Sequence, residues 1–102
     1  MADVIVTAAQ WCRAQGVKRG DLLGVMVQDW EWRYEVVRVT HVGRCWVVGS
    51  HVCLVHPRGR RYGGTPEVEG GADYETAWNY AGLFRPSEAV HDAVVSWMER
   101  GG

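Results

Sequence analysis

The sequence predicts an α+β fold, and two patterns carry this prediction. Between Gly20 and Pro57, β-branched and aromatic residues form four short runs with almost no spacer, which is typical of antiparallel strands joined by tight turns. On either side, residues 7–15 and 86–100 carry apolar residues at the spacing of an amphipathic helix. The chain has 102 residues, 47% of them hydrophobic, which is enough apolar material for one core. We therefore expect a single domain over residues 1–102.

The first expected element is a short helix over residues 7–15. Thr7 and Gln10 have the spacing of a capping box, in which the hydroxyl and amide side chains satisfy backbone groups at the helix start. Gly16 suits the position just after the helix, where a left-handed backbone is common. Val17 then stands where it can close against the last turn.

The expected sheet begins after the turn at Gly20–Asp21. Its four strands are predicted at 22–28, 33–41, 45–48 and 51–56. Gly49–Ser50 has the composition of a two-residue hairpin loop, so the last two strands are expected to pair across it. The second run has valines at both alternating positions, which predicts a central strand covered on each face.

Four short antiparallel strands after a Gly-Asp turn resemble the pattern of SH3-like small barrels, in which five bent strands close around one core. The resemblance covers about residues 20–62. It implies a small antiparallel SH3-like sheet or barrel in this part of the chain. One N-terminal helix and two C-terminal helices are then expected to pack on it.

The C-terminal part of the chain is expected to hold a loop and two helices. Residues 57–71 contain five glycines and two prolines, too many for any regular element longer than one brief strand around Arg61–Tyr62. Residues 73–83 place tyrosine, alanine and tryptophan side chains at helical spacing. Residues 86–100 show the same spacing more clearly, and Gly101 ends that helix.

Charge and cysteine content bear on partners and compartment. The net charge is -1 at pH 7, so the chain lacks the strongly basic character of a general nucleic-acid-binding protein. The charge is nevertheless uneven, because residues 1–62 are net positive and residues 63–102 are net negative. Three cysteines, an odd count, favour free thiols in a reducing compartment. We expect a cytoplasmic protein with no secretory signal and no membrane span, and the sequence does not indicate its oligomeric state.

Histidines and cysteines crowd the strand region and raise the question of a metal site. The five residues are His41, Cys45, His51, Cys53 and His56. The gap between Cys53 and His56 resembles zinc-ligand spacing. If Gly49–Ser50 is a hairpin loop, however, Cys45 and Cys53 point to opposite faces and do not share a metal. We therefore predict no metal site and buried free thiols.

Catalytic motifs are also missing from the sequence. It contains no nucleophile elbow, no phosphate-binding glycine loop followed by lysine, and no paired-carboxylate signature. A cysteine could act as a nucleophile, with a histidine as its base, only if the fold brought the two side chains together. We therefore expect neither an enzyme nor a cofactor.

The sharpest functional signal lies in the predicted turn at residues 29–33, which carries Trp30, Glu31, Trp32 and Arg33. Tryptophan and arginine supply much of the binding energy at protein interfaces. We expect this tip to dock on a larger protein partner, as a non-catalytic adaptor or inhibitor of the type that phages and mobile elements encode. In the competing interpretation, both indoles fold back over an open end of the barrel. The remaining tryptophans are expected in the core: Trp11, Trp46, Trp78 and Trp97.

The alternative function is nucleic-acid binding through a loop at residues 58–62. Arg58, Arg60 and Arg61 would contact phosphates, and Tyr62 would stack on a base. Ionic strength separates the two functions, because a phosphate-driven complex weakens steeply as salt is added. An interface anchored by tryptophan side chains would change little.

Overall fold

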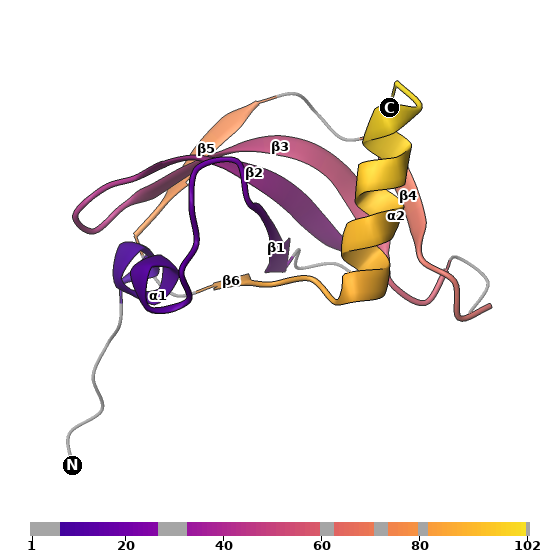
Figure 1. The fold of residues 1–102 in the computed structure, drawn as a ribbon, viewed down its shortest axis with the longest axis horizontal. Coiled ribbons are helices and arrows are strands. Elements are labelled where there is room, and N and C mark those ends of the chain that lie inside the picture. The colour runs from indigo at the N-terminus through magenta and orange to yellow at the C-terminus, as the bar shows by residue number, and fades with distance from the viewer. Residues whose placement is uncertain (1–6, 27–32, 60–62, 71–73, 80–81, 102) are drawn as a thin grey trace, which may run out of the picture.

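A computed structural model describes residues 7–26, 33–59, 63–70, 74–79 and 82–101. Within these ranges lie two helices and six strands, with the bounds α1 Ala8–Ala14, β1 Leu22–Met26, β2 Tyr34–Val42, β3 Val47–His56, β4 Glu67–Gly70, β5 Glu75–Trp78, β6 Leu83–Phe84 and α2 Glu88–Glu99 (Figure 1). The predicted α+β class is therefore confirmed. Neither of these two helices is long and apolar enough to cross a membrane.

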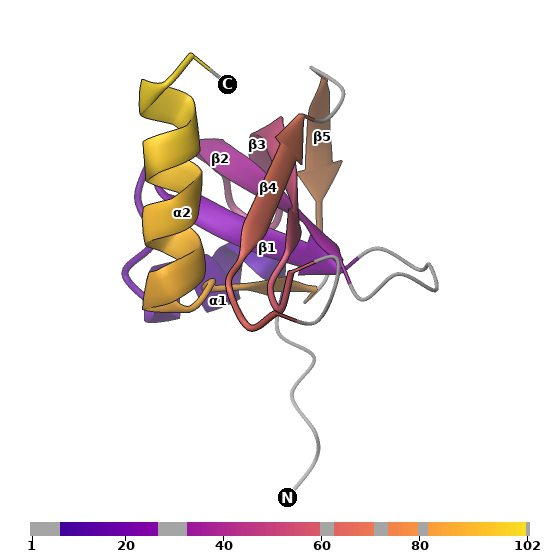
Figure 2. The same ribbon diagram turned by 90° about the vertical axis from the view of Figure 1, so that its right-hand side faces the viewer.

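The six strands form one antiparallel sheet: five follow the order β4-β3-β2-β1-β6, and β5 pairs with β3 beside this path. β3 is the longest strand, and two short strands share its outer edge (Figure 2): β5 pairs with residues 47–50 and β4 with residues 53–56. The sheet does not close, since β6 lies at one edge and β4 and β5 lie at the other. The antiparallel sheet is therefore confirmed, but the barrel implied by the SH3-like resemblance is not.

The predicted hairpin loop at Gly49–Ser50 is wrong, because both residues lie inside the continuous strand β3. The link between β2 and β3 comprises residues 43–46 instead. Gly49 serves a close approach: a Cβ atom there would lie 3.1 Å from the Trp78 ring and 3.2 Å from the Arg38 carbonyl oxygen. Glycine therefore lets the indole of Trp78 lie against the backbone of β3.

The predicted helix over residues 73–83 is also wrong. Its described residues contribute β5 and the first residue of β6. Tyr74 and Trp78 are four positions apart, a spacing that fits one face of a helix and equally one face of a strand. The strand is favoured over the helix because pairing with β3 buries Trp78, which is only 8% exposed.

The region predicted as a loop, residues 57–71, contains the strand β4. β4 pairs with the last four residues of β3. Val68 of β4 packs against the hydrophobic cluster beneath α2. This burial stabilises the extended conformation of an otherwise glycine-rich segment. The brief strand predicted around Arg61–Tyr62 lies outside the described residues.

The two faces of the sheet carry separate hydrophobic clusters. Neighbouring residues of a strand point to opposite faces, so Leu22 and Val36 join the cluster beneath α2 while Leu23 and Val37 join the cluster beneath α1. Each helix thus covers its own face of the sheet. This confirms the prediction that the valine-rich second run is a central strand covered on both sides.

The helices predicted at 7–15 and 86–100 are confirmed as α1 and α2. The capping box of α1 is present: Thr7 Oγ1 accepts a hydrogen bond from the Gln10 N–H at 3.1 Å, and Gln10 Oε1 accepts one from the Thr7 N–H at 3.0 Å. Ser87 caps α2 by accepting a hydrogen bond from a backbone N–H of its first turn. Gly16 and Gly101 follow the two helices with left-handed φ angles of 67° and 90°.

Candidate functional site

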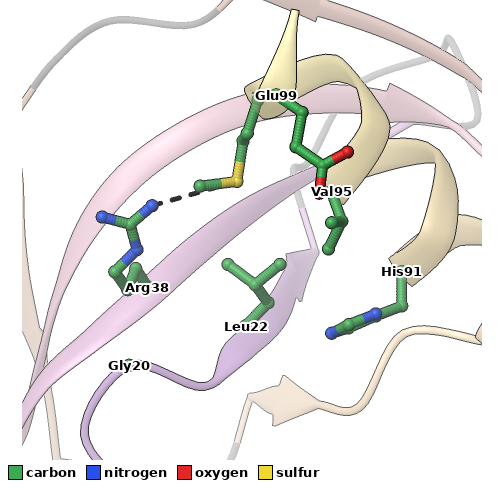
Figure 3. Close-up of a pocket in the computed structure, with 7 residues that line it drawn as sticks. Gly20, Leu22, Arg38, His91, Val95 and Glu99 are labelled. Atoms are coloured by element: carbon green, nitrogen blue, oxygen red, sulfur yellow. Dashed lines mark hydrogen bonds between the residues drawn. The ribbon is translucent and has the colours of Figure 1, made fainter.

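A groove of about 360 Å³ lies between α2 and the β1–β2 pair (Figure 3). Its floor is apolar and is formed by Leu22, Val95 and Met98. Leu22 is the first residue of β1 and is 7% exposed, while the other two side chains are half-buried. Val95 and Met98 therefore expose apolar surface to a bound molecule, while Leu22 stays buried.

The rim of the groove carries exposed polar side chains from two elements. Arg38 of β2 stands opposite Leu22 in the β1–β2 register. On α2, His91, Val95 and Glu99 follow each other at intervals of four residues and so form one column facing the groove. Figure 3 shows Arg38 on one side of Leu22 and the α2 column on the other.

The charges of the rim are separated across the groove. The Arg38 guanidinium lies 3.9 Å from the sulfur of Met98, so its positive charge stands beside the apolar floor. Glu99 supplies a negative charge at one end of the α2 column, and His91 lies 3.9 Å from the Asp92 carboxylate. This arrangement suits a guest that presents an apolar side chain next to a carboxylate. The described residues that line the groove include no serine, threonine or cysteine nucleophile.

A polar cluster lies on the α1 side of the sheet. The Glu35 carboxylate is 2.9 Å from His51 Nδ1, and the Tyr74 ring stacks on the His51 ring with 3.8 Å between centroids. His51 Nε2 is 3.5 Å from the Thr76 hydroxyl. Partial desolvation, together with the Glu35 carboxylate that accepts a hydrogen bond from it, raises the pKa of the Tyr74 hydroxyl.

The chemistry of this cluster is restricted by burial. A carboxylate, an imidazole and a hydroxyl in sequence are the groups of nucleophilic catalysis. His51 is only 8% exposed, however, and its contact with the Thr76 hydroxyl is at the long limit for a hydrogen bond. The arrangement instead ties β5 to β2 and β3, since its members come from all three strands.

A second ionic cluster involves one of the predicted protein-binding residues, Arg33. Its guanidinium forms a 3.1 Å ion pair with Glu69 of β4. The same carboxylate oxygen lies 3.5 Å from the buried His56 Nε2, a contact at ion-pair distance that lacks hydrogen-bond alignment among the described residues. Arg33 is therefore half-buried and engaged within the protein.

The other predicted binding residues are only partly covered by the structure. Trp30, Glu31 and Trp32 lie outside the described residues, as do Arg60, Arg61 and Tyr62. Arg58 is exposed just after β3. Both the protein-docking tip and the nucleic-acid loop therefore stay predictions.

The cysteines and histidines considered for a metal are spread over the sheet. Cys53 is buried in β3, whereas Cys45 is exposed in the 43–46 link and is not the buried thiol that was predicted. The described part of the chain contains no group of three or more His, Cys, Asp or Glu side chains that could hold a metal ion. Burial raises the pKa of the Cys53 thiol to about 12 and also raises that of Cys12. Both thiols therefore stay protonated and unreactive at neutral pH.

The exposure of Trp46 was not foreseen. Trp78 is buried, and Trp11 and Trp97 are partly buried against the two clusters, as expected of core tryptophans. Trp46 is 50% exposed, and the prediction that it lies in the core is wrong. It ends the 43–46 link between β2 and β3, whereas the sequence predicted it inside a strand at 45–48.

Comparison of the chain with protein-family models, with curated proteins and with solved structures gave no match. The proposals below therefore rest on the geometry and chemistry of the described residues.

Proposed function

We propose that this chain is a small non-catalytic accessory protein that binds a segment of a larger protein in the groove beside α2. The observation that carries the proposal is the apolar floor bordered by charges of both signs. Leu22 and Val95 would receive an apolar side chain of the partner, and Arg38 would pair with an acidic group next to it.

The openness of the groove favours a protein partner over a small molecule. Sites for small molecules commonly bury most of the surface of their ligand inside a concave pocket. Here the polar rim residues Arg38, His91 and Glu99 are all exposed, so a guest would keep one side in water. A side chain projecting from a partner protein meets this condition, because the rest of the partner covers the outer side.

The proposed non-catalytic role is supported by the state of the potential nucleophiles. Cys12 and Cys53 are buried, and burial raises the pKa of both thiols. His51 is buried between Glu35 and Tyr74. Packing beneath α1 accounts for Cys12, and packing within the sheet accounts for Cys53 and His51. The exposed thiol is Cys45, which lies in the 43–46 link and not among the described lining residues of the groove.

The turn at residues 29–33 remains the proposed second contact with the partner. Arg33 is the described residue of this segment, and its ion pair with Glu69 links the start of β2 to β4. The proposed compartment is the cytoplasm, which suits the free thiols of Cys12, Cys45 and Cys53.

Selection from a random peptide library displayed on phage tests the groove. We expect selected peptides to contain a bulky apolar residue next to an acidic one, and to bind Arg38→Glu at least tenfold more weakly. Arg58→Glu is the matched control, because Arg58 is an exposed arginine that does not line the groove. Peptides that bind Arg38→Glu and the wild type equally well would contradict the proposal.

A further inference from the structure

The end of the molecule around α1 carries an exposed indole among positive charges. The 43–46 link lies against α1, because the Arg13 guanidinium donates hydrogen bonds to the carbonyl oxygens of Gly43 at 2.7 Å and Arg44 at 3.1 Å. The Ala9 N–H donates a third hydrogen bond to the Cys45 carbonyl oxygen. This link is therefore anchored to the helix, and it presents Trp46 at 50% exposure.

Further positive charges cluster around the end of α1. Arg85 donates a 2.9 Å hydrogen bond to the Gln15 carbonyl oxygen in the C-cap of α1. Lys18 and Arg19 follow in the turn after the helix and are exposed. Among the described residues, Asp21 brings a carboxylate to this cluster, 3.8 Å from the Arg85 guanidinium. We define the α1-end surface as Arg13, Lys18, Arg19, Arg44, Trp46 and Arg85.

Carboxylates gather on α2 and β4, away from the α1 end. Figure 1 places α1 and the 43–46 link at one end of the longest axis, and α2 and β4 toward the other. That axis extends over 42 Å. Within α2 and β4 there are five carboxylates and no lysine or arginine: Glu67, Glu69, Glu88, Asp92 and Glu99. Arginines border these two elements, since Arg33 pairs with Glu69, Arg38 lies beside Met98 and Arg100 follows α2. An anion repelled by the carboxylates of α2 and β4 would approach the protein at the α1 end.

From this arrangement we infer that the α1-end surface binds single-stranded nucleic acid. Positive side chains that track a phosphate backbone, combined with an exposed aromatic ring on which a base stacks, are the two components of such sites. Arg44 and Trp46 stand two residues apart in one anchored link, so a phosphate and its base can be held together. An acidic protein would also be attracted by these charges, so an acidic peptide is one arm of the test.

This surface is distinct from the α2 groove and from the predicted loop at 58–62. None of its six residues lines the groove. A protein with both sites would join a protein partner at one end to a nucleic acid at the other. The two proposals can fail separately, because Arg38→Glu changes only the groove and Arg44→Glu changes only the α1 end.

Fluorescence anisotropy of a fluorescein-labelled dT12 oligonucleotide tests the inference. We expect binding at 25 mM NaCl, with log K falling against log salt at a slope of about -2 to -3 for three or four phosphate contacts. Trp46→Ala should weaken binding roughly tenfold, as expected for the loss of one stacked base, and Trp46→Tyr should restore part of it. Arg44→Glu should weaken binding and make the salt slope shallower by about 1.

Two variants serve as controls. Tyr74→Ala removes an exposed aromatic ring elsewhere, and Arg38→Glu reverses an exposed arginine outside the surface; both should bind dT12 like the wild type. Arg58→Glu reverses an exposed arginine of the competing 58–62 loop and so distinguishes that loop from the α1-end surface. Absence of dT12 binding at 25 mM NaCl would overturn the inference, as would unchanged affinity in Trp46→Ala. Loss of dT12 affinity in Arg58→Glu but not in Arg44→Glu would overturn the inference and would identify the 58–62 loop as the binding site. Binding of a polyglutamate peptide, but not dT12, would identify the surface as a site for acidic proteins instead.

Discussion

Replacement of Gly24 by alanine is expected to destabilise the protein, although alanine is the better residue in an ordinary strand. Gly24 lies in the middle of β1 and pairs with Phe84 of β6. A Cβ atom on residue 24 would lie 2.9 Å from the Cε1 atom of the Phe84 ring, and two other ring carbons would be closer still. The ring has to move for the methyl group to fit, and β6 has only two residues to hold it in place.

The size of the effect follows from the contacts that the ring makes. Overpacking of this kind costs about 1–3 kcal/mol. Phe84 also packs edge-to-face against Tyr34 with 4.8 Å between centroids, and loss of such a pair adds about 0.5–1.5 kcal/mol. The intrinsic preference for alanine over glycine offsets about 0.5–1 kcal/mol of this. We expect a net loss of about 2 kcal/mol in the free energy of unfolding, which corresponds to a fall in Tm of roughly 10 °C for a domain of this size.

Urea and thermal unfolding of three variants measure this effect. Gly63→Ala is the matched control, because no heavy atom lies within 4 Å of its added Cβ and its φ is not in the left-handed region; we expect it to change stability little. Phe84→Leu removes the ring, so the double variant Gly24→Ala/Phe84→Leu should be more stable than the sum of the single effects predicts. A Gly24→Ala protein as stable as the wild type, or strictly additive costs, would show that Phe84 does not cover Gly24.

Three further results are expected. Burial raises the pKa of the Cys53 thiol from 9.0 to about 12 and that of the Tyr34 hydroxyl from 10.0 to about 12. Because the folded state holds these protons more tightly than the unfolded state, the free energy of unfolding should fall as pH rises above 9. The fall should be less steep in Cys53→Ala. In native protein at pH 8, a thiol reagent should label Cys45 quickly and Cys12 and Cys53 only after denaturant is added, and three equally fast thiols would contradict the burial described. Ser87→Ala removes the N-cap of α2 and should lower the free energy of unfolding by about 1 kcal/mol, as measured in urea. Ser87→Asp keeps a side-chain acceptor at this position and should retain most of the wild-type stability.

The helices and the first two strands could be predicted from the sequence because their signals are local. The capping box of α1 joins Thr7 to Gln10, only three residues apart. The alternation in β1 and β2 assigns each apolar side chain to a face without knowledge of the partner strand. Errors began where the same residues fitted two structures, as at Gly49, whose hydrogen has to face Trp78 nearly thirty positions later.

The candidate sites could not be predicted from the sequence, because each joins side chains from distant segments. Arg38 meets the α2 column only because α2 packs on that face of β1 and β2. Arg13 donates hydrogen bonds to the carbonyl oxygens of residues 43 and 44, which are about thirty positions away in the sequence. No sequence pattern predicts a contact over such a separation. The charge asymmetry between the two halves was visible in the composition, but not that Trp46 would stand exposed beside Arg44.

The sequence by itself therefore determined the α+β class, the two capped helices, the central valine-rich strand and the division into basic and acidic halves. These features depend on hydrogen bonds within one turn and on the identity of neighbouring residues. Only the tertiary structure decided that β3 runs unbroken, that residues 75–78 are extended, and that the sheet stays open between two helices. Those outcomes depend on which distant strand offers hydrogen bonds and burial, a competition that local propensity does not record.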